Sequence, residues 1–229
     1  MTPEIPTPDE RDELSAVYGG IGFHARDAWK TAEAVYDEHT LRILGHPVME
    51  DWERPYMRVL AGIAARGGGR VLEIGFGMGI SAGFIAATPG VTEHLIIEAN
   101  HDVAERARRF AATVDGVDCR VHEGLWEEVI DRVPDGSVDG ILYDAYPLEE
   151  SEVMNQARFA PVAYRKLRPG GTFTYFSDEA RDYRPEHLAM LLAAGFVRER
   201  IDSEIVAVDP PEDCQYWKSS TLLAPILVR

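Results

Sequence analysis

From Arg70 onward, apolar runs of strand length alternate with segments of helical pattern. Such alternation predicts an α/β fold with a doubly wound, mostly parallel sheet. No clear helix separates the last two strands, which we expect to form an antiparallel hairpin at one edge. The predicted strands are 70–75, 94–99, 118–123, 138–143, 171–177, 201–208 and 221–228, and the predicted helices are 79–88, 101–113, 125–132, 155–167 and 185–194.

The chain is predicted to have three parts. Residues 1–20 are rich in proline and acidic side chains, which favours a flexible arm. Residues 21–66 are predicted to form a helical N-terminal lid, broken near residues 45–47 and at Pro55. Residues 67–229 carry the strand and helix alternation and form one structural unit with the lid, since no repeat or linker divides them.

The formal net charge of −16 disfavours binding to nucleic acid or to an anionic membrane. No apolar run approaches the ~20 residues of a membrane span, and the N-terminus lacks a signal pattern, so we expect a cytoplasmic protein. Cys119 and Cys214 make neither a disulfide framework nor a zinc pattern. We therefore expect no nucleic-acid or membrane partner and no metal; the sequence leaves open whether the protein is a monomer or a homodimer.

A glycine-rich loop, VLEIGFGMGIS (71–81), joins the first strand of the alternation to its helix. Gly75 and Gly77 allow a tight turn and close approach to a ligand. Gly79 comes one residue too early for the dinucleotide pattern G-x-G-x-x-G. With Glu73 two residues before the first glycine, the loop resembles motif I of S-adenosylmethionine-dependent methyltransferases, in which the acid can hold the cofactor's amino group.

Two further features favour an adenosine-type cofactor. Glu98 lies at the end of the second strand, 23 residues after Gly75, where a carboxylate can accept both ribose hydroxyls. The segment GLWEE (124–128) follows the third strand, where such folds place contacts to adenine. Trp126 is either an adenine-stacking residue or a core residue, and the pattern alone does not decide between them.

The segment GILYDAYPL (140–148) is an apolar strand that runs into a loop carrying Asp144 and Tyr146. The fourth strand of these folds ends at the switch point of the sheet, beside the reactive end of the cofactor. Asp144 is therefore placed to face the transferred group. The alternative is that its carboxylate only caps the following turn.

Several segments resemble the guanidinoacetate N-methyltransferase family from about residue 36 to the end. They are LRILGHPVMEDWERPYM (41–57), RVLEIGFGMGIS (70–81), GLWE (124–127), DGILYDAYPL (139–148), LRPGGTFTY (167–175) and PPEDCQYW (210–217). This family uses S-adenosylmethionine to methylate a guanidino nitrogen of a small molecule. The resemblance implies a seven-stranded Rossmann-like methyltransferase sheet closed by an N-terminal lid.

By position, the resemblance implies that Glu53 and Asp144 clamp the guanidinium. A guanidinium is planar and protonated, and its nitrogens are poor nucleophiles. Two carboxylates can grip it and align one nitrogen with the methyl group. That nitrogen becomes acidic as the new bond forms, so a bonded carboxylate can take its proton. We predict Asp144 as this base and Glu53 as the principal orienting partner.

The resemblance also implies a set of binding residues. Met49, Glu53 and Met57 recur every four residues, as on one helical face, although plain core packing also explains the methionines. The predicted cofactor set is Met49, Met57, Glu73, Gly75, Phe76, Gly77, Met78, Gly79, Ile80, Ser81, Glu98, Ala99, Asn100, Trp126, Glu127 and Asp144. The predicted substrate set is Trp29, Glu53, Asp144, Tyr146, Asp178 and Glu179.

The chain departs from the family after TFTYF, where only SDEARDYRPE (177–186) precedes the next helix. In the family, backbone N–H groups of this loop bind the substrate carboxylate. The matching positions are Asp178 and Glu179, which would repel a carboxylate and suit an ammonium group. We therefore favour free L-arginine or a similar guanidino amino acid, with Arg181 or Arg184 for its carboxylate, unless these charges are merely solvated.

Four alternatives remain. The enzyme could form creatine as a guanidinoacetate N-methyltransferase, or could methylate arginine in proteins, although no separate domain for a polypeptide is evident. A nicotinamide-dependent oxidoreductase is disfavoured by the glycine spacing. A non-catalytic sensor of S-adenosylmethionine would need neither Glu53 nor Asp144.

Overall fold

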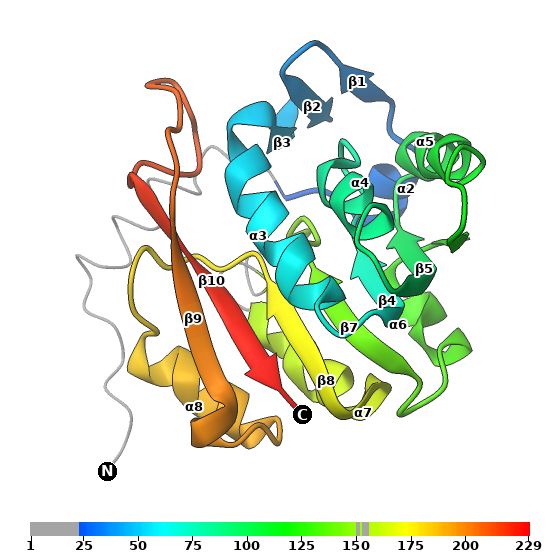
Figure 1. Cartoon of the computed structure of the whole chain (residues 1–229). Coiled ribbons are helices and arrows are strands. Elements are labelled where there is room, and N and C mark those ends of the chain that lie inside the picture. The colour runs from blue at the N-terminus through cyan, green and yellow to red at the C-terminus, as the bar shows by residue number, and fades with distance from the viewer. Residues whose placement is uncertain (1–22, 150–151, 153–155) are drawn as a thin grey trace.

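The computed structural model describes residues 23–149, 152 and 156–229. Seven strands form one sheet in the order β6-β5-β4-β7-β8-β10-β9 (Figure 1). The first five of these are parallel, whereas β10 is antiparallel to both of its neighbours. The bounds are β4 Gly69–Ile74, β5 Val91–Glu98, β6 Asp118–Glu123, β7 Val138–Tyr143, β8 Leu167–Tyr175, β9 Ile201–Ala207 and β10 Thr221–Val228. The predicted sheet and its edge hairpin are confirmed.

Helices cover both faces of this sheet, and each face has its own apolar core. One layer consists of α3 Arg54–Ala65, α4 Ile80–Ala86 and α5 His101–Ala111. The other consists of α6 Trp126–Val129, α7 Ala160–Lys166 and α8 Pro185–Ala193. Short 3-10 turns are Asp51–Glu53, Ile130–Arg132, Gln156–Phe159 and Arg198–Arg200. No helix in the described part of the chain is long and apolar enough to cross a membrane.

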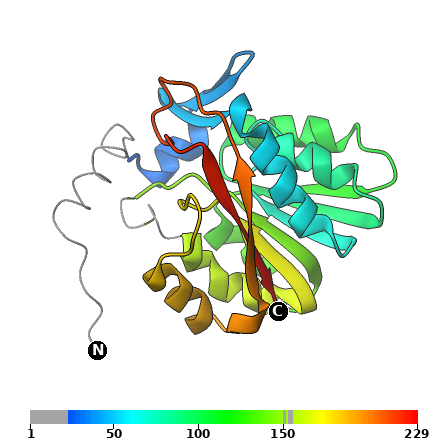
Figure 2. The ribbon, with the colours of Figure 1, turned by 60° about the vertical axis from the view of Figure 1, so that its left-hand side comes forward.

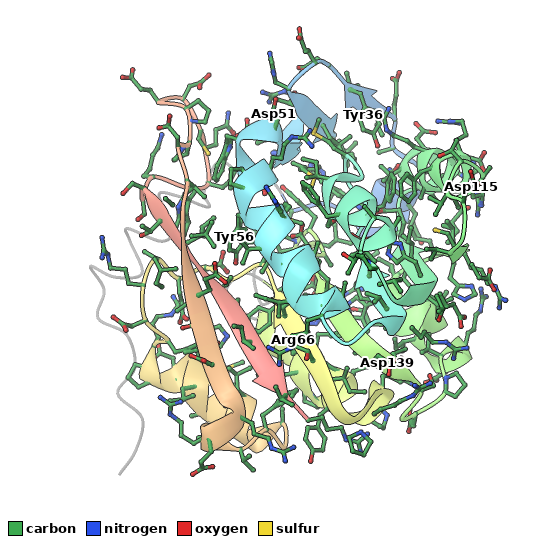
Figure 3. The ribbon with its side chains drawn as sticks, in the orientation of Figure 1. Tyr36, Asp51, Tyr56, Arg66, Asp115 and Asp139 are labelled. Carbon is green, nitrogen blue, oxygen red and sulfur yellow. The ribbon has the colours of Figure 1, made fainter. Side chains whose placement is uncertain are left out.

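Helix α3 connects the lid to the sheet. Pro55 lies in its first turn, where proline is tolerated, and its apolar side packs on β7 and β8. The two ends of this helix are fixed to the sheet (Figure 3). Tyr56 Oη donates to the carbonyl of Leu223 at 2.8 Å, and Arg66 Nε donates to Thr172 Oγ1 at 2.9 Å. These bonds fix the chain that directly follows Glu53.

The lid is not wholly helical, which corrects the prediction for residues 21–66. Among the described residues of the lid, α-helices occupy α2 Arg26–Thr31 and α3, while most of the chain between them forms a three-stranded antiparallel sheet, β1-β2-β3. Its strands are β1 Ala34–Tyr36, β2 Thr40–Ile43 and β3 His46–Glu50. The predicted flexible arm, residues 1–20, lies outside the described residues.

The physical reason is a two-residue hairpin turn. Leu44 and Gly45 both have positive φ, 53° and 83°, which matches the right-handed twist of paired strands. Alternate burial of Leu41 and Ile43 then follows the period of a strand. The four-residue spacing between Met49 and Glu53 therefore does not mark one face of a helix, because Met49 lies in β3.

Candidate functional site

A cavity lies at the carboxyl ends of β4 to β8, beneath the lid. This is where ligands bind in open α/β sheets. It is lined from the sheet, from α2, β2 and β3, and from the segment between β9 and β10. The predicted site residues that line it are Trp29, Met49, Glu53, Gly75, Gly77, Glu98, Ala99, Trp126, Glu127, Asp144, Tyr146 and Asp178.

The glycine loop after β4 forms the floor of the cavity. Gly75 has a φ of 88°, and a Cβ atom there would lie 2.1 Å from the carbonyl oxygen of Asp144. Gly77 also has a positive φ, and its Cβ would meet the sulfur of Met49 at 2.9 Å. Only glycine fits at position 75, where the clash is with backbone, and the positive φ favours glycine at position 77. The loop is thus pressed against the two segments that carry the predicted acid and the lid methionine.

Glu98 ends β5 beside this loop and is nearly fully buried. Its carboxylate accepts the backbone N–H of Phe76 at 2.9 Å and that of Asn100 at 2.8 Å. Burial raises the pKa of Glu98, while these backbone donors act in the opposite direction. A fixed carboxylate that faces the cavity next to a glycine loop fits the hydroxyl groups of a ribose.

Trp126 and Glu127 lie at the far end of the cavity. The indole packs edge-on against Phe159, with ring centroids 5.1 Å apart, and also lines the cavity, so its core packing is observed and adenine stacking stays a prediction. Glu127 binds Arg26 of the lid at 3.1 Å and also pairs with Arg158. These ion pairs hold α2 against α6.

The lid closes over the sheet through aromatic and sulfur contacts. The ring of Trp29 stacks on Tyr146, with centroids 4.4 Å apart and planes 14° apart. The sulfur of Met49 lies 3.3 Å from the backbone nitrogen of Met78 and accepts its hydrogen bond. These contacts join the lid to the loop after β7 and to the glycine loop.

Glu53 is the buried acid of the lid. Its Oε1 accepts the N–H of Glu50 at 2.8 Å and the hydroxyl of Tyr216 at 2.6 Å. Burial, with the charge of Asp144 as the second cause, raises the pKa of Glu53 to about 8. The side chain therefore faces the cavity in a setting where its charge lacks solvation.

Asp144 follows β7 and faces the same cavity. Burial raises the pKa of Asp144 to about 7, and the charges of Glu73, Asp178 and Glu98 act in the same direction. Carboxylates whose pKa is raised by burial and by one another are returned to their ionised form by a bound cation. The arrangement of Glu53 and Asp144 is therefore suited to a positively charged ligand.

The stability of the ligand-free protein should depend on these acids. The pKa of Glu53 in the folded protein is above its ordinary value of 4.5. The stability that Glu53 contributes to the folded state is therefore complete below pH 4.5 and is lost as pH rises through about 8. The variant Glu53→Gln keeps an acceptor for Glu50 and Tyr216. We expect its free energy of unfolding to exceed that of the wild type by roughly 1–3 kcal/mol at pH 9. Thermal unfolding from pH 4.5 to 9 measures this, and a difference independent of pH would contradict it.

Two predicted acids are engaged elsewhere. Glu73 is fully buried, and its carboxylate binds Ser81 Oγ and lies 2.9 Å from His94 Nε2. Glu179 is buried against Arg184, at 3.2 Å, and His187, at 2.9 Å. The other predicted residues that do not line the cavity are Met57, Phe76, Met78, Gly79, Ile80, Ser81 and Asn100.

Among the lining residues that the sequence prediction does not include, four bear on the site's polar and aromatic contacts. Arg26 and Glu152 belong to the ion pairs at the far end, and Phe176 and Tyr216 lie near the predicted acids. Tyr216 lies within PPEDCQYW, a segment that carries the family resemblance, so that segment was the available signal. The other three residues reach the cavity through packing between distant segments of the chain, for which the sequence carries no local signal.

The fold is shared with solved structures. The chain is similar to spermidine synthase from Thermotoga maritima, with a TM-score of 0.59, 13% identity, and coverage of 86% of this chain and 72% of that one. It is also similar to the YcgJ protein of Bacillus subtilis, with a TM-score of 0.51, 21% identity, and coverage of 65% and 70%. At these identities the likeness shows the fold alone.

The family follows from the sequence match. The model of the guanidinoacetate N-methyltransferase family matches residues 19–229, and the chain belongs to this family. The predicted resemblance is therefore confirmed.

Curated relatives carry a different name. The chain is 39% identical over 193 residues to protein arginine N-methyltransferase 2 of Aspergillus oryzae, covering 78% of this chain and 46% of that protein. It is 34% identical over 142 residues to the protein of the same name from Eremothecium gossypii, covering 59% and 33%. The chain thus spans a third to about half of the length of these relatives.

Proposed function

We propose that this protein transfers a methyl group from S-adenosylmethionine to a guanidino nitrogen of a small molecule. The observation that carries this proposal is the placement of Glu53 and Asp144 in one cavity beside the glycine loop. Both carboxyl groups have a raised pKa, which a bound cation would lower. A planar guanidinium is a cation that two carboxylates can grip at once.

The chain offers fitting partners for the cofactor. Gly75 and Gly77 permit close approach of the backbone, Glu98 suits the ribose, and Trp126 offers a ring face at the far end. When bound, S-adenosylmethionine supplies an electrophilic methyl group. Met49, which packs against the glycine loop, lies on the lid side of the same space.

Asp144 and Glu53 have different roles toward the substrate. Binding of the guanidinium stabilises both carboxylates in ionised form and releases protons that they hold near neutral pH. Glu53 orients the guanidinium plane, and Asp144 fixes the attacking nitrogen. On transfer, S-adenosylhomocysteine would be the leaving group, and the proton that the methylated nitrogen must lose would pass to Asp144 and from there to solvent.

Asp178 favours a substrate that bears an ammonium group. It lines the cavity, and its charge acts on Asp144. The predicted carboxylate partners do not line the cavity, since Arg184 binds Glu179 and Arg181 is exposed. Among the described lining residues the only cationic side chain is Arg26, at the opposite end. A guanidino amino acid such as L-arginine therefore suits this end better than guanidinoacetate.

Steady-state rates with both compounds test this preference. We expect kcat/KM for L-arginine to exceed that for guanidinoacetate by about tenfold, since a tenfold ratio needs only one charged contact. In Asp178→Asn this ratio should fall toward one. Asp182→Asn is the matched control, because it removes an exposed charge from the same loop. A clear preference for guanidinoacetate would contradict the substrate assignment while leaving guanidino methylation intact.

A second candidate is methylation of arginine within proteins. The specific observation in its favour is the name of the curated relatives, protein arginine N-methyltransferase 2. Intact-mass measurement of candidate proteins incubated with enzyme and S-adenosylmethionine separates the two. A gain of one or more methyl groups on protein arginine, with no turnover of free guanidino compounds, favours this candidate.

A further inference from the structure

The segment between β9 and β10, residues 208–220, forms one wall of the candidate site. In Figures 1 and 2 this segment rises from the edge hairpin at the same end of the molecule as the strands of the lid. Its Tyr216 lines the cavity, and the ring contacts that of Trp52 with centroids 5.8 Å apart. The segment thus reaches the turn of the lid that carries Glu53.

Two donors converge on one oxygen of Glu53. The hydroxyl of Tyr216 donates to Oε1 at 2.6 Å, and the backbone N–H of Glu50 donates to the same atom at 2.8 Å. A carboxylate oxygen has two lone-pair directions, so these two hydrogen bonds occupy both acceptor positions of Oε1. The oxygen that can accept from a guanidinium in the cavity is therefore Oε2.

We propose that Tyr216 is a positioning residue, which fixes the carboxylate of Glu53 so that Oε2 is presented to the guanidino substrate. This inference rests on the proposed function. It adds Tyr216 to the residues that control substrate binding, beyond the two predicted acids. Glu50 itself accepts from Trp52 Nε1 at 2.8 Å, so the 50–53 turn is braced on both sides of the bond to Tyr216.

The same hydrogen bond also adjusts the charge of Glu53. Donation from Tyr216 lowers the pKa of Glu53 and opposes the larger effect of burial. The pKa of Tyr216 is raised, by burial and by Glu53, far above the neutral range, so its hydroxyl remains a donor. Loss of this hydroxyl should leave Glu53 protonated over a wider pH range and less able to hold a cation.

Tyr216→Phe tests the inference, because it removes one hydroxyl and keeps the ring beside Trp52. We expect kcat/KM for the guanidino substrate to fall about tenfold at pH 7, mainly through KM, as for loss of one hydrogen bond to a charged group. The acid limb of the pH profile should move to higher pH, and the loss should shrink at pH 9. Tyr183→Phe is the control, since the hydroxyl of Tyr183 bonds the backbone of Asp202.

A second measurement needs no turnover. Carbon-13 NMR of the Glu53 carboxyl group in the ligand-free protein should give a higher pKa in Tyr216→Phe than in the wild type or in Tyr183→Phe. An unchanged Glu53 pKa, or a loss of kcat/KM that is equal at every pH, would overturn the positioning role. If the wild type methylates no guanidino compound, the proposed function fails instead, and the NMR titration still decides whether Tyr216 controls Glu53.

Discussion

Asp144→Asn is expected to reduce methyl transfer to a guanidino substrate by about 10³-fold, the range typical for loss of a positioned general base. The amide cannot accept the proton that the nitrogen must lose, and it offers the guanidinium no charge. The effect should fall mainly on kcat, because Glu53 still binds the cation. Rates from S-adenosylhomocysteine formation under single-turnover conditions measure it.

The variant should keep its fold. The backbone N–H of Asp144 bonds the carbonyl of Ile74 at 2.9 Å, a contact that the side chain does not make. Asp115→Asn is the control, since it removes a charge from an exposed position after α5 (Figure 3) that does not line the cavity. Activity of Asp144→Asn within a few fold of wild type would eliminate Asp144 as the base.

Gly75→Ala should abolish cofactor binding and destabilise the fold by more than about 2 kcal/mol, because its Cβ would collide with backbone at a positive φ. The new atom would lie 2.1 Å from the carbonyl oxygen of Asp144, so β4 and β7 would have to separate at the cavity. Calorimetric titration with S-adenosylmethionine and urea unfolding measure the two effects.

Gly83→Ala is the matched control for this substitution. Gly83 lies within α4, and a Cβ there meets no atom within 4 Å. Alanine should therefore stabilise this helix by about 0.5–1 kcal/mol and leave cofactor binding unchanged. If Gly75→Ala behaves like Gly83→Ala, the glycine loop is not the tightly packed floor described above.

The sheet and one end of the site could be predicted because their signals are local. Continuous apolar runs mark the buried parallel strands, and the position of Asp144 or Glu98 after its strand fixes the edge on which it lies. The lid was harder. Its hairpin depends on Leu44, a non-glycine residue at positive φ, for which the sequence carries no clear marker.

The environments of buried charges were not predictable from the sequence. Glu73 has the spacing of a motif acid, yet His94 and Ser81 bind it inside the core. Glu179 lies next to Asp178 in the chain but faces His187 and Arg184 instead of the cavity. In both cases the partner comes from a different element, so only tertiary packing decides which carboxylate reaches a ligand.

The central claim is that the methyl group reaches a guanidino nitrogen under control of Glu53 and Asp144. The most direct test supplies S-adenosylmethionine with a deuterated methyl group, together with L-arginine or guanidinoacetate, and locates the label in the product by mass spectrometry and NMR. We expect the label on a guanidino nitrogen with wild type and almost none with Asp144→Asn. Label on an amine or carboxylate, or no transfer by protein that binds the cofactor, would contradict the claim.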